Sequence, residues 1–366
     1  MRFHVSQSDI LTGVQTVQRA VSTQTIVPVL SGILLDAEEE HVRLSGTDTQ
    51  IRIEWKTPAR VEEPGKVVLP VKYLAEMLRR TPDTEVSIAV GEASLAEITW
   101  GGAHYVVHGL PAEGFPELKT PQNLTQIETT QGVIRSLIRR TVFASARDES
   151  RILLTGVLFK ASRGKIDMVA TDGVRLSKVS ARFGGDLGDV EAIIPSRALG
   201  EMARLCSGHE DEPGILSIGP KNVLLEVGGA RLASSLIEGQ YPEYERVMPR
   251  DFASVLTVER NALHDALDRA GLVSQSSNAV RLRARDGRIN ISAHAPAVGQ
   301  GVEEIEGLIQ GSDMEISFNA RYVTEGLKAF DSGDILVQVP GPDKATVIKA
   351  PGDDDFVYLV LPLKIG

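Results

Sequence analysis

Apolar and polar positions follow one plan that repeats three times along the chain. When the sequence is divided into three parts of about 122 residues, each part opens with apolar residues at the spacing of an amphipathic helix. Two runs of alternating, β-branched residues follow, joined by a short polar turn, as in half-buried antiparallel strands. The opening helices are predicted at Ser6–Ser22, Thr130–Arg147 and Glu259–Ser274.

A second helix is predicted in each part, after a strand that ends in proline or in a capping residue such as Asn319. Another alternating stretch completes each part. The second helices are Val71–Arg80, Ser196–Gly208 and Asn319–Phe330. We therefore predict an α+β fold of three repeated domains, each with two helices packed on antiparallel sheet. Their predicted boundaries are 1–122, 123–249 and 250–366.

Short motifs keep the parts in register. Thr47-Asp48 recurs as Thr171-Asp172, and GFPEL recurs as QYPEY. Paired carboxylates at Asp48 and Asp172 would suit acid–base chemistry, but a position after a strand and a threonine favours an Asx turn. The connecting segments are neither long nor low in complexity, so we expect the three domains to pack together.

Composition narrows the class of protein. The 366 residues include 39 basic and 49 acidic side chains, a net charge of -10, and one cysteine. No stretch approaches the roughly 20 apolar residues of a membrane helix, and the first residues lack the apolar core of a signal peptide. We expect a soluble, cytoplasmic protein without membrane contact. The acidic balance argues, taken alone, against a nucleic-acid partner.

Three motifs in order resemble the bacterial DNA polymerase III beta subunit family, the sliding clamps. They are ATDGVRL from Ala170, EGQYPEYERVMP from Glu238 and YLVLPLKI at the end of the chain. The resemblance covers the whole chain. It implies a head-to-tail homodimeric ring with outer sheets and inner helices that encircles duplex DNA. It also implies partners, namely the DNA polymerase III alpha subunit, the clamp loader and other proteins with clamp-binding motifs, and neither catalysis nor a cofactor.

Helix packing supports a dimer. Helices in contact lie about 8–10 Å apart, so six enclose a hole of about 17 Å, narrower than a duplex of roughly 20 Å. Twelve helices enclose about 34 Å. A closed ring of three-domain chains around DNA therefore needs two copies.

The charges are unevenly distributed. The six predicted helical segments carry about +7 together, which leaves about -17 for the rest of the chain. Basic helices facing DNA fit this division, whereas ordinary solvated helix faces are the alternative. Contacts to phosphates alone carry no sequence information, as sliding requires. The candidate DNA-facing residues are Arg19, Lys72, Arg79, Arg135, Arg139, Arg147, Arg197, Arg204, Arg321 and Lys328.

The resemblance also implies a pocket for partner peptides between the second and third domains. Apolar walls with a few polar groups suit a Leu or Phe anchor, and Arg175 and Arg246 are expected at the rim. Val174 stands where the family commonly has histidine, and Leu361 and Leu363 where it can have methionine. A plain last sheet strand is the alternative for the end of the chain. The implied pocket residues are Leu154, Thr171, Gly173, Val174, Arg175, Leu176, Pro242, Arg246, Val247, Val360, Leu361, Pro362 and Leu363.

Tyr105, Leu272 and Val273 match family positions at the joint between the two copies, although Leu272 and Val273 also fit a plain helix core. Gln24 lies in a loop where related clamps can carry arginine, and Gly366 follows the expected terminus. A diverged clamp paralogue that acts as a partner-binding scaffold remains an alternative.

An enzyme is the main competing class. The sequence has no Walker A, HExxH or GxSxG motif. Cys206 and His209 could form a nucleophile–base pair, but a buried small cysteine is the simpler interpretation. His104 and His108 have no carboxylate or thiolate at ligand spacing, so we predict no metal site. The Asp353–Asp355 run is more typical of a solvated loop than of a cation site.

Overall fold

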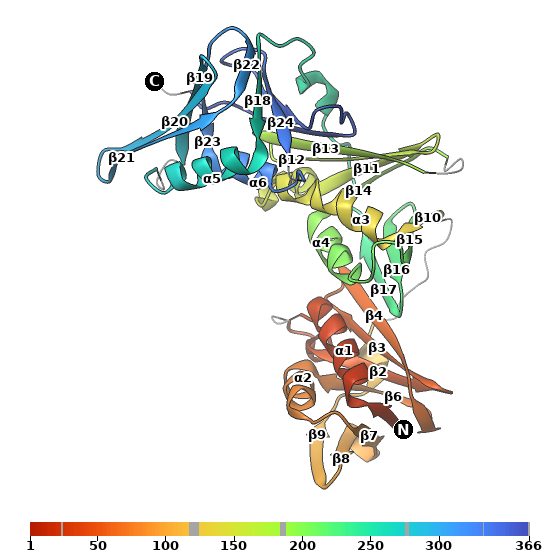
Figure 1. Cartoon of the computed structure of the whole chain (residues 1–366). Helices are drawn as coiled ribbons and strands as arrows, with labels where there is room; N and C mark the ends of the chain where they lie inside the picture. Colours follow the sequence, from red (N-terminus) through yellow and green to blue (C-terminus); the bar gives the residue numbers. More distant parts are fainter. Residues whose placement is uncertain (23–24, 117–123, 184–187, 275–277, 332, 365–366) are drawn as a thin grey trace. The chain divides into compact units, whose positions relative to one another are not determined.

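The computed structural model describes residues 1–22, 25–116, 124–183, 188–274, 278–331 and 333–364 (Figure 1). The chain forms two compact units. Unit 1 comprises Met1–Arg135 and Gly200–Leu236, and unit 2 comprises Ser136–Leu199 and Ile237–Gly366. The boundary between the units falls within two helices, α3 and α4. Among the described residues, no helix has the length and apolar character that crossing a bilayer requires.

All six predicted helices occur in the described residues, and most are shorter than predicted. Their bounds are α1 Gln7–Val17, α2 Val71–Arg80, α3 Gln131–Arg139, α4 Ser196–Leu205, α5 Arg260–Gly271 and α6 Ala320–Leu327. The capping residue Asn319 starts α6 as predicted, because its side chain accepts a hydrogen bond from the Arg321 amide.

The largest error concerns α3, which ends eight residues before Arg147. Thr141 donates its hydroxyl to the Leu137 carbonyl at 2.8 Å, and a short 3₁₀ helix at Val142–Ala144 follows. Side-chain bonds of this kind compete with the helical ladder. Arg147 was predicted on a helix, and that prediction is wrong, although the residue is exposed.

Unit 1 contains two antiparallel sheets. The eight-stranded sheet has the order β10-β15-β16-β17-β4-β3-β2-β6, and the five-stranded sheet has the order β5-β1-β7-β8-β9. Helix α1 packs on β3 and β4, where Gly13 lies so close to Trp55 that an added Cβ would come within 2.7 Å of the indole. The strands are β1 Arg2–Ser6, β2 Gly32–Glu38, β3 His41–Thr47, β4 Ile51–Pro58, β5 Arg60–Glu63, β6 Gly65–Pro70, β7 Glu85–Val90, β8 Leu95–Trp100, β9 Ala103–His108, β10 Thr125–Thr130, β15 Pro213–Ile218, β16 Asn222–Val227 and β17 Ala230–Ser235.

Unit 2 also contains two antiparallel sheets. The nine-stranded sheet has the order β14-β11-β12-β13-β26-β25-β24-β18-β22, and the four-stranded sheet has the order β21-β20-β19-β23. Helices α5 and α6 pack on each other. The strands are β11 Gly156–Ser162, β12 Lys165–Thr171, β13 Arg175–Arg182, β14 Val190–Pro195, β18 Ser254–Glu259, β19 Ala279–Arg285, β20 Arg288–Ala295, β21 Gly299–Glu306, β22 Leu308–Gly311, β23 Met314–Asn319, β24 Asp334–Val339, β25 Thr346–Lys349 and β26 Phe356–Val360.

The two large sheets contain the same local arrangement of strands. In unit 1 the order is β17-β4-β3-β2-β6, and in unit 2 it is β26-β13-β12-β11-β14. In each case four strands come from one sequence repeat and the fifth, β17 or β26, comes from the next repeat. The sequence repeats are therefore joined by continuous hydrogen-bonded sheet within each unit.

The turns that lead into β4 and β13 confirm the Asx interpretation. Asp48 Oδ1 accepts a hydrogen bond from the Ile51 amide at 2.9 Å, and Asp172 Oδ1 accepts one from the Arg175 amide at 3.0 Å. Each carboxylate therefore stabilises a turn of its own backbone, and the two turns are equivalent.

Candidate functional site

An apolar pocket of about 210 Å³ lies in unit 2, where β13, the turn before it, the segment after Pro242 and the residues after β26 meet. We refer to it as the apolar pocket. Nine of the thirteen predicted residues line it, together with four residues that were not predicted. The lining consists of Leu154, Thr171, Gly173, Val174, Arg175, Leu176, Pro242, Glu243, Tyr244, Val247, Ala345, Leu359 and Leu361.

The floor of the apolar pocket is the hydrophobic core of the β11–β14 sheet. Leu176 and Leu359 are buried, and Tyr241 and Tyr244 pack against the same cluster. Burial raises the pKa of both tyrosines, so their hydroxyls stay protonated near neutral pH. The Leu361 amide donates to the Val174 carbonyl at 2.9 Å and holds the end of the chain beside the turn. The wall is therefore apolar and built on regular structure.

Arg175 was expected at the rim of the pocket. It does not lie there, because its side chain is only 5% exposed. Its guanidinium donates to the Asp172 carboxylate at 3.0 Å, the Glu325 carboxylate at 2.5 Å and the Phe143 carbonyl at 2.7 Å, and it stacks over the Tyr322 ring. Burial is the largest influence on the pKa of Arg175 and would lower it, but the hydrogen bond to Glu325 and the neighbouring charges, including Glu325 and Asp172, together raise it. Arg175 therefore joins β13 to α6 inside unit 2.

Four predicted pocket residues, unlike Arg175, lie outside the lining. Val360 lies in β26 and is fully buried. Because side chains alternate along the strand, it faces away from the pocket, and its neighbours Leu359 and Leu361 face the pocket. Arg246 is 80% exposed and pairs with Glu243 at 2.5 Å. Beyond Leu361 the chain leads away from the pocket: Pro362 is half-buried, and the amide of Leu363 donates to Ser317.

The alternative interpretation of the chain end is right only in part. Phe356–Val360 is the last strand, β26, whereas residues 361–364 lie beyond the strand. Tyr244 and Leu359 line the pocket but were not predicted. The repeat of GFPEL as QYPEY pointed to Tyr244, and the alternation of β26 pointed to Leu359. Gly366 and Gln24 lie outside the described residues.

Most candidate DNA-facing residues are exposed. The exception is Arg135, which is half-buried and donates to the Cys206 carbonyl at 2.9 Å. Several others have acidic partners within one helical turn, such as Arg204 with Glu201 at 2.5 Å and Arg321 with Glu325 at 2.8 Å. The exposed candidates are Arg19, Lys72, Arg79, Arg139, Arg147, Arg197, Arg204, Arg321 and Lys328.

The basic excess of the helices is smaller than the sequence suggested. Over the helices as the structure bounds them, the net charge is about +4 rather than about +7, mainly because Arg140 and Arg147 lie beyond α3. The most basic helices are α2 and α3. Helix α2 presents Lys72 and Arg79 to solvent opposite the buried Leu74 and Leu78.

Two sheet edges expose apolar side chains. In unit 1, β9 is an edge strand on which Tyr105 is 47% and Val106 53% exposed, and the Tyr105 ring stacks on Trp100 at 4.9 Å between centroids. In unit 2, Val302 on the edge strand β21 is 65% exposed, and Leu272 after α5 is 63% exposed. Leu272 is therefore not helix core, while Val273 is half-buried. Val106 and Val302 were not predicted.

The environment of Cys206 does not suit the alternative of a nucleophile–base pair. Burial raises the pKa of Cys206 to about 11, so the thiol is neutral and a poor nucleophile. No group of three or more His, Cys, Asp or Glu side chains in the described part of the chain is placed to hold a metal ion.

Comparison with known proteins identifies relatives along the whole chain. Family models described as the N-terminal, central and C-terminal domains of the DNA polymerase III beta subunit match residues 1–119, 128–243 and 245–364. A beta sliding clamp of a Synechocystis species is 31% identical, with 100% of both chains covered. One from Staphylococcus aureus is 29% identical, covering 100% of this chain and 99% of the relative.

Solved structures agree with this result. The DNA polymerase sliding clamp from Bacillus subtilis matches with a TM-score of 0.96 and 30% identity. A sliding clamp from Pseudomonas aeruginosa, solved with griselimycin bound, matches with a TM-score of 0.95 and 27% identity. Both comparisons cover 100% of each chain.

Proposed function

The chain belongs to the DNA polymerase III beta subunit family, and on this premise we propose that two copies of it close head to tail into a ring around duplex DNA. It is a DNA sliding clamp. Within the proposed ring it acts as a processivity factor, holding a polymerase on DNA by topology rather than by catalysis.

One observation carries the proposed ring: each unit has a free sheet edge with exposed apolar side chains. An edge strand offers unpaired N–H and C=O groups to another strand. The β9 edge of one copy, with Tyr105 and Val106, would pair with the β21 edge of its partner, with Val302 nearby. Because these surfaces differ, each copy contributes one of each, and the proposed ring of two copies contains two equivalent joints.

The DNA contacts are proposed to come from the exposed basic side chains of the helices. Lys72, Arg79 and Arg139 are examples, and they hold phosphates without reading bases. Loose electrostatic contacts of this kind permit sliding, and salt screens them. The binding of the ring to DNA then depends on closure rather than on affinity.

The apolar pocket is proposed as the docking site for partner peptides, including those of the DNA polymerase III alpha subunit and the clamp loader. Its buried Leu176 and Leu359 suit a hydrophobic anchor. A relative from Pseudomonas aeruginosa binds griselimycin, which supports ligand binding by clamps of this family.

The test is retention on circular DNA. The chain is loaded onto nicked circles with a clamp loader and ATP, washed in high salt, and the circles are then cut once. We expect retention on intact circles and loss after cutting, and a native mass of twice 39.5 kDa. Equal, salt-sensitive binding to circular and linear DNA would overturn the ring, as would a monomer at micromolar concentration.

A further inference from the structure

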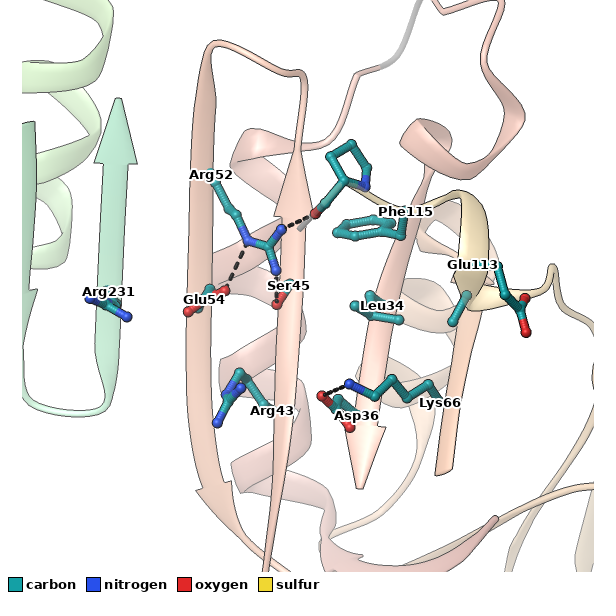
Figure 2. Close-up of a pocket in the computed structure, with 12 residues that line it drawn as sticks. Leu34, Asp36, Arg43, Ser45, Arg52, Glu54, Lys66, Glu113, Phe115 and Arg231 are labelled. Atoms are coloured by element: carbon teal, nitrogen blue, oxygen red, sulfur yellow. Dashed lines mark hydrogen bonds and ion pairs between the residues drawn. The ribbon is translucent and has the colours of Figure 1, made fainter. Parts of the chain in front are cut away.

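A cavity of about 780 Å³ lies in unit 1 on the face of the eight-stranded sheet opposite α1. Leu44 and Trp55 contact Gly13 of α1, so their strand neighbours Arg43 and Glu54 point to the other face. Figure 2 shows charged side chains from five adjacent strands on this face. We call it the ionic cavity. Its lining is Leu34, Asp36, Arg43, Ser45, Arg52, Glu54, Lys66, Ala112, Glu113, Phe115, Pro116 and Arg231.

The ionic cavity occupies the same sheet face of its repeat as the apolar pocket does in unit 2. Strands β17-β4-β3-β2-β6 correspond in order to β26-β13-β12-β11-β14. Phe115 of GFPEL packs on Leu34, as Tyr241 of QYPEY packs with Leu158. Counted from the shared Thr-Asp turn, Arg52 stands where unit 2 has the pocket residue Leu176.

The charges on this face are reversed between the repeats. In unit 1, Asp36 lies opposite Arg43 and binds Lys66 at 2.9 Å. In unit 2 the corresponding strand positions hold Lys160, opposite Asp167, and Glu191, which pairs with Lys160 at 3.2 Å. The two repeats have the same strand arrangement, but the charges that a ligand would meet on this face are opposite.

Two of the four cations in the ionic cavity are already satisfied. Arg52 donates to Glu54 and to the Pro116 carbonyl, and Lys66 binds Asp36, so two of the three acids in the lining, Glu54 and Asp36, are paired (Figure 2). The other two cations, Arg43 and Arg231, make only longer contacts with carboxylates. Their closest carboxylates are 3.7 Å from Arg43 and 3.4 Å from Arg231.

Buried polar atoms without a hydrogen-bond partner line the same cavity. The Nε atom of Arg231 makes no hydrogen bond with the described residues, and its contact with the Glu226 carboxylate is an ion pair of 3.4 Å. Asp36 is only 5% exposed, and its Oδ1 likewise has no hydrogen-bond partner in the described part of the chain. Unpaired buried polar groups are unfavourable and favour a ligand that supplies the missing partner after a small side-chain adjustment.

We propose that the ionic cavity is a second peptide-docking site, one that takes an extended segment of a partner protein carrying acidic side chains. Arg43 and Arg231 bind the carboxylates of the segment, since guanidinium groups suit carboxylates geometrically. An amide N–H of the segment donates to Asp36. The inference goes beyond the proposed function, because no part of it requires the ring, the DNA or the apolar pocket.

A peptide fits better than DNA or a lone small anion. The charged side chains spread across five strands, a span of roughly 19 Å at the usual strand spacing of about 4.8 Å, which one small anion does not cover. The face lies opposite α1, so it is not the helical surface to which we assign DNA. The strand register places these groups in two rows across the sheet, with Arg231, Glu54 and Ser45 in one and Arg43, Asp36 and Lys66 in the other. In both rows a cation lies beside an acceptor, which matches the alternating groups of an extended peptide.

The test uses a fluorescein-labelled, amidated heptapeptide of sequence Ser-Ala-Glu-Ala-Glu-Ala-Ser, which lacks a hydrophobic anchor. Its binding to the full chain is followed by fluorescence anisotropy. We expect saturable binding that weakens at least tenfold when both Glu residues are replaced by Gln. The double variant Arg43→Gln/Arg231→Gln should weaken it by a similar factor, whereas the control Leu361→Asp, in the apolar pocket, should not.

Four results would overturn the proposal. They are no saturable binding up to millimolar protein, equal binding of the Glu and Gln peptides, wild-type affinity in the Arg43/Arg231 double variant, and displacement of the peptide by inorganic phosphate at the same concentration as by unlabelled peptide. The double variant should still be retained on circular DNA. Failure of the wild-type chain in that assay would instead count against the proposed ring.

Discussion

The ionic cavity of unit 1 and the apolar pocket of unit 2 are built on the same five-strand arrangement and differ in side chains. Leu158, Val169 and Leu176 form an apolar floor in unit 2, whereas the equivalent positions in unit 1 are Leu34, Ser45 and Arg52. A repeated backbone thus carries two binding chemistries. Side chains on one sheet face can change without cost to the opposite face, where the helices pack.

The position before Arg52 shows the opposite exchange. Ile51 is buried in unit 1, whereas unit 2 has the buried, triply hydrogen-bonded Arg175. At this pair of positions, unit 2 therefore has its charge beneath the pocket, in contact with α6, whereas unit 1 has its charge on the cavity face.

The largest effect is expected from Arg175→Ala. The substitution leaves Asp172 and Glu325 without their buried partner, so unit 2 should lose about 3–5 kcal/mol of unfolding free energy. Urea unfolding with hydrogen exchange on β13 measures it. The matched variant Ile51→Ala should cost unit 1 about 2–5 kcal/mol through lost apolar packing. A loss below 1 kcal/mol for Arg175→Ala would show that the buried network contributes little.

Next in size is the loss of peptide binding at the apolar pocket. Leu361→Asp places a charge in the wall, and the affinity for a peptide with a Leu or Phe end should fall roughly 30-fold, equivalent to about 2 kcal/mol. Leu308→Asp, at a residue 70% exposed outside the pocket, is the control and should leave affinity unchanged. If the two variants behave alike, peptides bind elsewhere.

A charge exchange tests the equivalence of the two faces directly. Lys66→Ala should destabilise unit 1 by about 1–3 kcal/mol, because Asp36 is then buried without a partner. The triple variant Asp36→Lys/Arg43→Asp/Lys66→Glu recreates the unit 2 arrangement and should unfold within about 1 kcal/mol of wild type. The urea unfolding midpoints of the wild type, Lys66→Ala and the triple variant measure these changes in stability. A triple variant less stable than Lys66→Ala would contradict the equivalence.

The smallest effect is an opposite pH response of the two regions. The hydrogen bond to Asp36 raises the pKa of Lys66 above its usual 10.5, so its contribution is complete below pH 10.5 and is lost as pH rises further. Burial alone would raise the pKa of Glu325, but hydrogen bonds from Arg321 and Arg175 lower it below its usual 4.5.

The contribution of Glu325 is therefore present above pH 4.5 and lost as pH falls through the lowered value. Urea midpoints across pH should shift at the alkaline end in Lys66→Met and at the acid end in Glu325→Gln. A midpoint shift at the acid end in Lys66→Met, or at the alkaline end in Glu325→Gln, would contradict the opposite pH responses of the two regions.

Sequence reasoning predicted the parts of the apolar pocket that depend on local pattern. The Thr171-Asp172 turn and the repeat of GFPEL as QYPEY were visible as motifs. Arg175 was misplaced at the rim because its partner Glu325 is 150 residues away along the chain. Val360 was misplaced because the register of β26 against β13 sets which of its side chains face the pocket.

The ionic cavity was not predicted at all. Its residues are ordinary charged positions of separate strands, and Arg231 reaches the face only because β17, from the next repeat, pairs with β4. The local sequence pattern of β17 does not indicate that β4 is its partner strand. The ends of the helices were misjudged for a similar reason, since Thr141 ends α3 through its own hydroxyl although the apolar spacing continues.

By itself, the sequence determined the threefold repeat, the starts of the helices, the alternation of the strands and the family of the protein. Each is recorded in spacing and turn chemistry within a few neighbouring residues. Only the tertiary structure decided which strand completes each sheet, which arginine is buried and which charges are left without a close partner. Those outcomes depend on burial and pairing between distant segments, because desolvation and hydrogen bonding act through space rather than along the chain.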